Sequence, residues 1–224
     1  MCGRFTQAAP GEVVADLFQL AAAPALAPRY NIAPTQDVAA VRVGTGGGRE
    51  LVALRWGLLP PWARDGAAAA RMINARAETL AEKPAFRAAF RARRCLIVAD
   101  GFYEWRRHGA AREPYYFARR DARPFGFAGL WERWRSEGSG PVESCAIITT
   151  AANELVAPVH DRMPVILDPA EFRLWLDPEA RDPDALARLL RPRVGAGMRA
   201  HPVSALVNDP RNDVPACREP LAVG

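Results

Sequence analysis

The chain has 224 residues, of which half are hydrophobic and a quarter are charged, and its formal net charge is +5. This composition is that of a globular protein with a real core, and it excludes a disordered tail, a coiled coil and a collagen-like fibre. The sequence has no run of about 18 apolar residues, and its opening MCGRFTQ lacks the features of a signal peptide. We therefore expect one domain over residues 1–224 that is cytoplasmic, monomeric and free of membrane contact.

Four segments carry the signals of helices. Pro10–Leu20 and Pro84–Arg93 each place apolar side chains on one face behind an opening proline. Asp168-Pro169 and Asp182-Pro183 each offer an N-cap side chain followed by a proline at the first helical position. We predict helices at these four places.

Most of the remaining chain has the apolar runs and the Gly and Pro punctuation of strands. Short connections at Asp100-Gly101 and Arg107–Glu113 favour antiparallel neighbours over crossover units, and the glycine-rich segment Gly44–Gly48 predicts a loop. These features indicate an α+β fold with a mostly antiparallel β core flanked by helices. The predicted strands are Val38–Val43, Leu51–Trp56, Cys95–Ala99, Phe102–Arg106, Tyr115–Ala118, Phe125–Leu130, Cys145–Thr150 and Val165–Leu167.

The cysteines lie far apart along the chain. Cys2, Cys95, Cys145 and Cys217 form no C-x-x-C pair, and only three histidines accompany them. This spacing supports neither a zinc site nor a disulfide framework. We expect no bound metal and no cofactor.

The positive charge is carried by arginine, because Lys83 is the only lysine. Guanidinium groups bind phosphate in bidentate fashion, so this bias suits an anionic partner such as a nucleic acid. A GC-rich genome also produces chains rich in Ala, Gly, Pro and Arg without selection for phosphate binding. The charge alone leaves both interpretations open.

Cys2 is the most informative position. Removal of an initiator methionine is favoured when the next side chain is small, and the mature chain would then begin with a cysteine. Its amine and thiol have ordinary pKa values of roughly 8 and 8.5, so both are partly unprotonated near neutral pH. Such a pair can condense with an aldehyde to an imine and then close to a five-membered thiazolidine. The alternative is that Cys2 is simply a small residue after the start codon.

Five separated motifs occur in one order along the chain: Cys2–Phe5, Asn74–Thr79, Asp100–Trp105, His160–Pro164 and His201–Ser204. Together they closely resemble the SRAP family, the SOS-response-associated peptidase or abasic-site processing proteins, from the first residue to about Asn208. The resemblance implies a barrel-like β core. It also implies an N-terminal cysteine that captures the ring-opened aldehyde of an abasic site in single-stranded DNA as a thiazolidine crosslink.

Matched motif by motif, the resemblance implies four catalytic residues. Cys2 is the nucleophile, Asn74 orients the N-terminal amine or the crosslinked sugar, and Glu104 and His160 form a proton-transfer pair. The abasic sugar is mostly a closed hemiacetal, so an acid–base group must open it, and a histidine can do this at cellular pH. The aromatic neighbours of Glu104 indicate partial burial and a raised pKa. Without the family pattern, Glu104 could be an outward-facing strand residue and His160 a polar loop residue.

Three arginines lie beside these motifs. Arg4, Arg76 and Arg162 are placed where the phosphates flanking a bound lesion would run. Trp62, in the segment LPPW, matches a family segment that wedges an aromatic side chain against the base stack. The next residue is Ala63, where family members can carry a second aromatic, so we expect a weaker preference for duplex junctions.

Asn31 and Pro34, in the segment YNIAPT, also match the family. The resemblance implies that they shape the wall of the DNA-binding pocket. They complete the set of residues for which we expect a role in DNA binding.

Three other functions compete with this interpretation. Met-Cys-Gly also opens class II glutamine amidotransferases, although we find no further motif of that class in the chain. An N-terminal thiol facing a glutamate and a histidine could instead cleave a peptide bond, as the peptidase label suggests. The third alternative is a noncovalent single-stranded DNA-binding module in which Cys2 is incidental.

Overall fold

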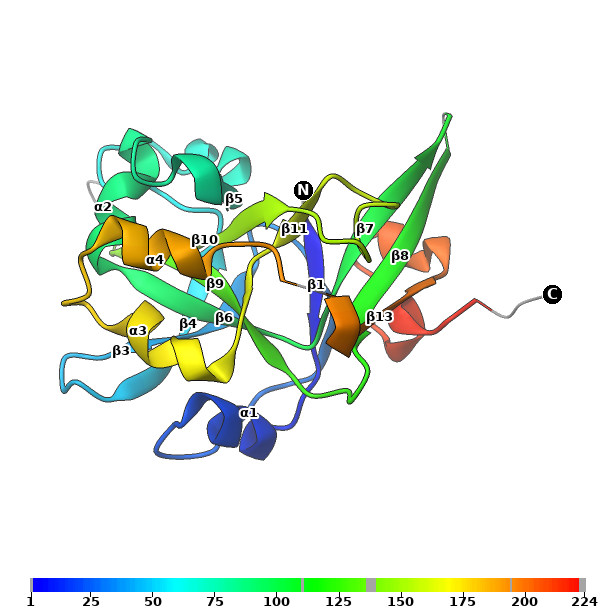
Figure 1. Ribbon diagram of the computed structural model, residues 1–224, viewed down its shortest axis with the longest axis horizontal. Coiled ribbons are helices and arrows are strands. Elements are labelled where there is room, and N and C mark those ends of the chain that lie inside the picture. The colour runs from blue at the N-terminus through cyan, green and yellow to red at the C-terminus, as the bar shows by residue number, and fades with distance from the viewer. Residues whose placement is uncertain (1, 110, 136–139, 194, 222–224) are drawn as a thin grey trace.

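Two β-sheets form the centre of the protein, which the computed structural model describes for residues 2–109, 111–135, 140–193 and 195–221 (Figure 1). The larger sheet has the strand order β11-β10-β4-β3-β6-β9-β12. Because β9 also pairs with β10, strands β10, β4, β3, β6 and β9 close into a five-stranded barrel. The bounds are β3 Asp37–Val43, β4 Arg49–Trp56, β5 Asn74–Arg76, β6 Arg94–Ala99, β9 Phe125–Trp134, β10 Val142–Ala151, β11 Arg162–Pro164 and β12 Ile166–Leu167.

The second sheet is antiparallel throughout and has the order β13-β8-β7-β1-β2. Its strands are β1 Arg4–Gln7, β2 Arg29–Ile32, β7 Gly101–His108, β8 Ala111–Arg119 and β13 Met198–Pro202. The pairing of β7 with β1 ends at Tyr103, opposite Arg4. From there β7 and β8 continue as a two-stranded ribbon that projects from the body of the molecule (Figure 1). We call this ribbon, residues 105–109 and 111–113, the β7–β8 arm.

Helices cover the barrel on the side away from the arm (Figure 1). They are α1 Gly11–Phe18, α2 Pro84–Ala92, α3 Phe172–Leu176 and α4 Pro183–Leu189. The ring of Phe18 stacks on Phe172 at 5.3 Å, which joins α1 to α3. Short 3-10 turns occupy Gly66–Arg71, Ala77–Thr79, Pro169–Glu171, Gly195–Gly197, Ala205–Asn208 and Pro215–Arg218.

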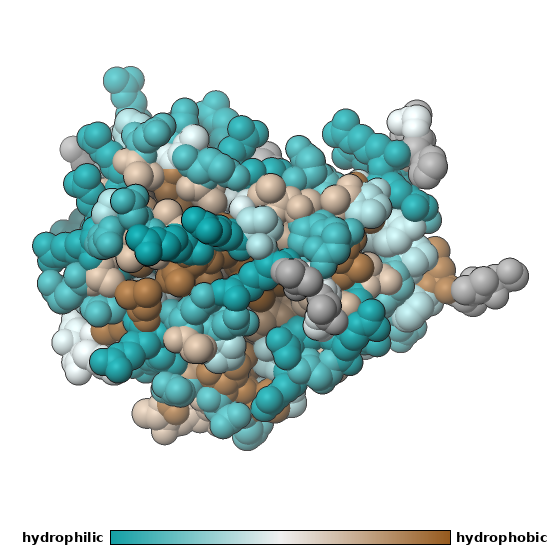
Figure 2. Space-filling model, in the orientation of Figure 1, coloured by the Kyte–Doolittle hydropathy of each residue, from teal (hydrophilic) through white to brown (hydrophobic). Residues whose placement is uncertain are grey.

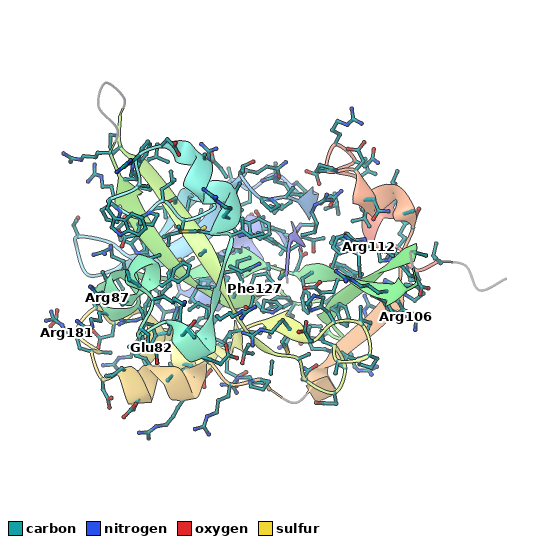
Figure 3. All side chains as sticks on the ribbon, turned by 90° about the horizontal axis from the view of Figure 1, so that it is seen from above. Glu82, Arg87, Arg106, Arg112, Phe127 and Arg181 are labelled. Atoms are coloured by element: carbon teal, nitrogen blue, oxygen red, sulfur yellow. The ribbon has the colours of Figure 1, made fainter. Side chains whose placement is uncertain are left out.

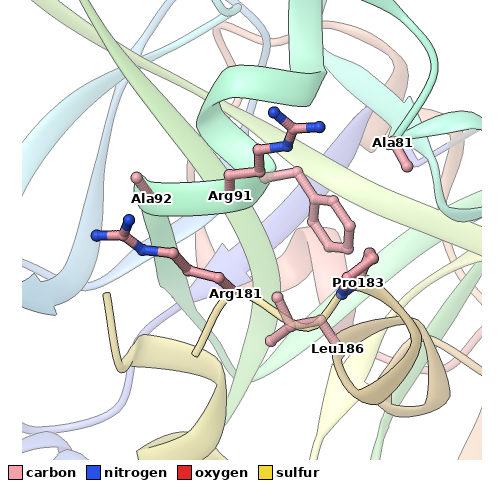
Figure 4. A pocket seen from close by; sticks show the side chains of 7 residues that line it. Ala81, Arg91, Ala92, Arg181, Pro183 and Leu186 are labelled. Atoms are coloured by element: carbon pink, nitrogen blue, oxygen red, sulfur yellow. The ribbon is translucent and has the colours of Figure 1, made fainter. Parts of the chain in front are cut away.

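A cavity of about 540 Å³ lies between α2 and α4 (Figure 4). Phe90 and Leu186 line it, with Arg91 and Arg181 close by. None of the residues predicted to act on DNA borders it. On the face seen in Figure 2, hydrophilic side chains predominate at the surface. Among the described helices, none has the length and apolar character needed to cross a lipid bilayer.

All the predicted strands and helices are present, with ends shifted by a few residues. Asp168 forms a capping box with Glu171 ahead of α3, and the Asp182 side chain caps α4. Five short strands were not predicted, namely β1, β2, β5, β11 and β13, because runs of three to five residues are too short to show strand periodicity.

The prediction for Asp100-Gly101 was wrong. This connection does not join antiparallel neighbours, because β6 belongs to the barrel sheet and β7 to the second sheet. The Asp100 carboxylate instead accepts hydrogen bonds from the Thr6 hydroxyl and the Ala8 amide, which ties β1 to this corner. A Cβ at Gly101 would lie 2.1 Å from the Tyr116 hydroxyl oxygen, so glycine is required for the chain to pass from one sheet to the other here.

Candidate active site at the amino terminus

Cys2 lies immediately ahead of β1 and is fully buried, with 0% of its surface exposed. Its position is fixed by Phe5, whose ring packs against Trp56 at 5.2 Å and Phe127 at 5.7 Å in the core. Burial, and secondly the negative charge of Glu104, raise the pKa of the Cys2 thiol well above its usual range. The thiol is therefore held in its neutral form. Met1, whose removal we predict, is outside the described residues.

Asn74 holds the backbone of Cys2. Its side-chain amide donates a hydrogen bond of 2.9 Å from Nδ2 to the Cys2 carbonyl oxygen. Asn74 itself is placed by β5, which pairs in parallel with β10 and sets Asn74 opposite Ile147. Among the described residues, the Asn74 Oδ1 atom is buried and has no hydrogen-bond partner. This oxygen is an acceptor positioned within the site.

Glu104 lies on β7, two residues beyond Phe102, whose ring stacks on Phe117 at 4.9 Å. Only 2% of Glu104 is exposed. Burial raises the pKa of its carboxyl from an ordinary value of 4.5 to about 7. Near neutral pH the carboxyl is thus close to half protonated, which allows it to act either as an acid or as a base.

His160 faces Glu104 from the turn before β11. Its Nε2 lies 4.0 Å from Oε2 of Glu104, and its Nδ1 lies 3.0 Å both from the Arg162 amide nitrogen and from a carboxylate oxygen of Asp161. Burial lowers the pKa of His160 and favours the neutral ring. A backbone amide can only donate, so in the neutral ring Nδ1 is the acceptor and the proton resides on Nε2, toward Glu104.

The fold therefore brings together the four residues predicted to be catalytic, which come from four separate segments of the chain: Cys2, Asn74, Glu104 and His160. Asn74 bonds to Cys2, the charge of Glu104 acts on the Cys2 thiol, and His160 faces Glu104. Their common location is just ahead of β1, between β5 and β7 (Figure 1). The catalytic role of each remains a prediction. Within the described ranges, no three His, Cys, Asp or Glu side chains cluster as a metal site would need.

Arg4 is used within the fold. Its guanidinium donates to Asn31 Oδ1 at 2.8 Å and to the carbonyl oxygens of Val207 and Asn208 at 2.6 and 3.1 Å. Asn31 is fully buried, and its Nδ2 donates to the same Val207 carbonyl and to the carbonyls of Asp209 and Asn212. In this conformation Asn31 cannot touch DNA. It can influence DNA binding only by holding Arg4 and the segment around Val207.

We expect Asn31→Ala to lower the free energy of unfolding by about 3 kcal/mol, because it leaves the Arg4 guanidinium and several backbone carbonyls without their buried partner. Urea unfolding followed by tryptophan fluorescence measures this. Asn212→Ala is the control: its Nδ2 donates to the exposed Leu206 carbonyl, and the expected loss is about 1 kcal/mol or less. Equal urea midpoints for both variants would contradict the assignment.

Arg162 is paired with a carboxylate. Its two terminal nitrogens lie 2.6 and 2.9 Å from the oxygens of Glu78, and one of them also donates to the Thr149 carbonyl at 2.7 Å. Glu78 neutralises the charge that was predicted to meet a phosphate. Arg76, by contrast, is exposed at the end of β5. Of the three arginines beside the motifs, only Arg76 presents its guanidinium openly to solvent.

Trp62 is 62% exposed, which is unusual for so large an apolar side chain. The loop that carries it is anchored by buried Leu59 and by a hydrogen bond of 2.7 Å from the Trp134 indole to the Ala63 carbonyl oxygen. Its exposure is compatible with stacking on a base. Pro34 is half-buried in the turn after β2, beside Thr35, which has a φ of 73°.

Several site residues were missed from the sequence. Glu78 and Asp161 lie inside quoted motifs, yet no role was predicted for either, and Thr149 lies in a strand expected only to pack. The contacts of Arg162 with Glu78 and Thr149 could not be predicted because they join segments far apart in the sequence. The only available signal was that Asp161 follows a candidate catalytic histidine directly.

The closed barrel and the second sheet that carries the amino terminus are shared with solved structures. A protein from Bacteroides thetaiotaomicron superposes with a TM-score of 0.84 at 28% sequence identity, covering 98% of this chain and 100% of that one. A protein from Bordetella bronchiseptica gives a TM-score of 0.79 at 29% identity, with 91% and 100% covered. These neighbours define the fold class as that of SRAP proteins.

Residues 1–210 match the model of SRAP, described as SOS response associated peptidase, and the chain belongs to this family. It is 43% identical over 219 residues to the abasic site processing protein YoqW of Bacillus subtilis, which covers 96% of this chain and 97% of that one. It is 32% identical over 200 residues to the abasic site processing protein HMCES of Gallus gallus, covering 79% and 59%.

Proposed function

We propose that this protein captures the ring-opened aldehyde of an abasic site in single-stranded DNA as a thiazolidine, through Cys2 after Met1 has been removed. The observation that carries the proposal is the convergence of Asn74, Glu104 and His160 on Cys2. The names of the relatives, abasic site processing proteins, point to the same lesion. The crosslink shields the lesion during the response to DNA damage, in a cytoplasmic, monomeric protein.

The reaction joins one aldehyde to two groups of the same residue. The Cys2 amine attacks the aldehyde carbon and forms a carbinolamine, which loses water to give an imine. The thiol then adds to the imine carbon, its proton passes to the nitrogen, and the ring closes. One C–N and one C–S bond form, the aldehyde oxygen leaves as water, and no oxidant or reductant is needed.

Glu104 and His160 supply the proton transfers in this scheme. A carboxyl with a pKa of about 7 can accept the ammonium proton and return a proton to the departing oxygen. A neutral His160 with its proton on Nε2 can donate toward the sugar oxygen as the closed hemiacetal opens. The unpartnered Oδ1 of Asn74 supports a further role, accepting a hydrogen bond from the amine or from a sugar hydroxyl.

The DNA is proposed to lie across this site with its bases unpaired. Trp62 offers an exposed ring on which a base can stack, and Arg76 offers an exposed guanidinium for a phosphate. Cys2 has 0% exposure in the chain that still carries Met1. Removal of Met1 is proposed as the step that frees the amine.

The test is to incubate the purified protein with single-stranded DNA that holds one abasic site and to weigh the denatured products. We expect a mass equal to the Met1-free protein plus DNA minus water. Matched DNA without a lesion, and DNA with a tetrahydrofuran residue that cannot open to an aldehyde, should give none. Absence of the adduct from a preparation confirmed to lack Met1 would refute the proposal and leave a peptidase or a noncovalent DNA binder.

A further inference from the structure

We propose that the β7–β8 arm is a second phosphate-binding surface, which holds the DNA backbone where it leaves the site at Cys2. This inference rests on the proposed function only in taking DNA as the partner. The arm carries three arginines, Arg106, Arg107 and Arg112, and only one carboxylate, that of Glu113, so its net charge is positive.

Arg107 and Arg112 are directly opposite each other in the hairpin, so their side chains emerge on the same face. Both are exposed. Among the described residues, no carboxylate lies within 4.0 Å of either guanidinium, whereas Arg106 is paired with Glu113 at 2.6 Å. Like charges facing each other across two strands destabilise a hairpin. A phosphate between them removes that repulsion, which is why a polyanion fits this surface.

The arm is braced at its base, so its charges are held in place. The Trp105 indole donates to Asn208 Oδ1 at 2.8 Å, and the Arg106 guanidinium lies 4.9 Å from the centre of the Tyr115 ring. A two-stranded ribbon alone is only marginally stable, and these contacts stiffen it without using Arg107 or Arg112. Figure 3 shows Arg106 and Arg112 on the arm, on the opposite side of the molecule from Arg87.

The arm also lies beside the site. β1 pairs with β7 only as far as Tyr103, so the part of β7 that leads into the arm begins beside the segment in which Cys2 precedes β1. Figure 1 shows the amino terminus between the β5 side of the barrel and the arm. The positive charge of Arg107 also lowers the pKa of His160, by far less than burial does. A strand crossing Cys2 would therefore meet Arg76 on one side and the arm on the other.

The experiment measures binding without crosslinking, using single-stranded DNA that carries a central tetrahydrofuran residue. Fluorescence anisotropy from about 50 to about 200 mM salt gives the slope of log K against log salt for the wild type and for R107Q/R112Q. Each phosphate contact to a single strand contributes about 0.7 to that slope, so the double variant should lose about 1.4 and bind about 20-fold more weakly at about 0.1 M salt. R107K/R112K should restore the slope.

The matched control is R87Q/R91Q, which removes the same charge from exposed positions on α2. We expect its slope to change by less than about 0.5. Equal losses in the two double variants, or no loss in R107Q/R112Q, would overturn the proposal. Crosslinking of the wild-type protein to true abasic DNA is measured separately from this binding. If the wild-type protein binds DNA but forms no adduct with abasic DNA, the crosslinking function is refuted, whereas the proposal that the arm binds phosphate is not.

Discussion

Cys2→Ser is expected to abolish the adduct that survives denaturation, lowering its yield about 1000-fold or more. Serine is also small, so removal of Met1 remains favoured and the amine stays free. That amine can still form an imine with the aldehyde. The hydroxyl is a far poorer nucleophile than the thiol, so the ring does not close and the imine hydrolyses when the protein is unfolded. Mass spectrometry of the denatured reaction measures the loss.

The same variant tests the order of the two steps. Borohydride added before denaturation reduces an imine to a stable amine, so Cys2→Ser should give a borohydride-dependent adduct with abasic DNA. A chain with leucine inserted between Met1 and Cys2 should give no adduct that survives denaturation without borohydride, because the large residue retains the methionine and the nitrogen of Cys2 becomes an amide. Equal crosslinking by the inserted chain would rule out the thiazolidine mechanism.

The barrel strands could be predicted from the sequence because they are long and apolar. Their apolar runs are largely buried in the structure, as in β6, where every residue is buried. The hairpin of β7 and β8 followed from the short, polar segment between them. The closure of the barrel by β9 and β10 is a long-range pairing, and nothing local in the two strands indicates it.

The parts of the site that could not be predicted are those built by the short strands. Arg4, Asn31, Asn74 and Arg162 all lie on strands of three or four residues, which exist only because a longer strand or a buried anchor such as Phe5 holds them. The motifs identified these residues as important without showing what each one contacts. For Arg162, which was predicted to bind phosphate, the motif gave no sign of the ion pair with Glu78.

Glu104→Gln is expected to make the protein more stable and less reactive. The pKa of Glu104 is raised from 4.5 to about 7 by burial. The unfolded chain therefore ionises this group at lower pH than the folded one, and folding loses stability as pH rises from about 4.5 to about 7. At 1.36 kcal/mol per pH unit, the full cost is about 3 kcal/mol. Glutamine does not ionise and removes this cost. The free energy of unfolding of the variant should therefore exceed that of the wild type by up to about 3 kcal/mol at pH 8 and by little at pH 4.

Glu78→Gln is the control for the direction of this pH-dependent change in stability. The hydrogen bonds from Arg162 lower the pKa of Glu78, so its ion pair stabilises the fold at neutral pH and this contribution is lost as pH falls through the lowered pKa. Glu78→Gln should therefore be less stable than the wild type at pH 8, in the opposite direction to Glu104→Gln. Urea unfolding at pH 4 and pH 8 measures both variants. If Glu104→Gln is less stable than the wild type at pH 8, then burial of the ionised Glu104 carboxylate does not destabilise the fold.

The reactivity of Glu104→Gln follows from the same burial. A group that transfers protons in the rate-limiting step contributes about 100-fold or more to the rate, so adduct formation should slow by at least that factor and lose the part of its pH dependence that the Glu104 carboxyl contributes near pH 7. Because a catalytic group cannot change an equilibrium, release of the aldehyde from the purified adduct should slow equally and the final extent of crosslinking should be unchanged. Release at the wild-type rate would remove Glu104 from the proton-transfer step and leave it only a positioning role toward His160.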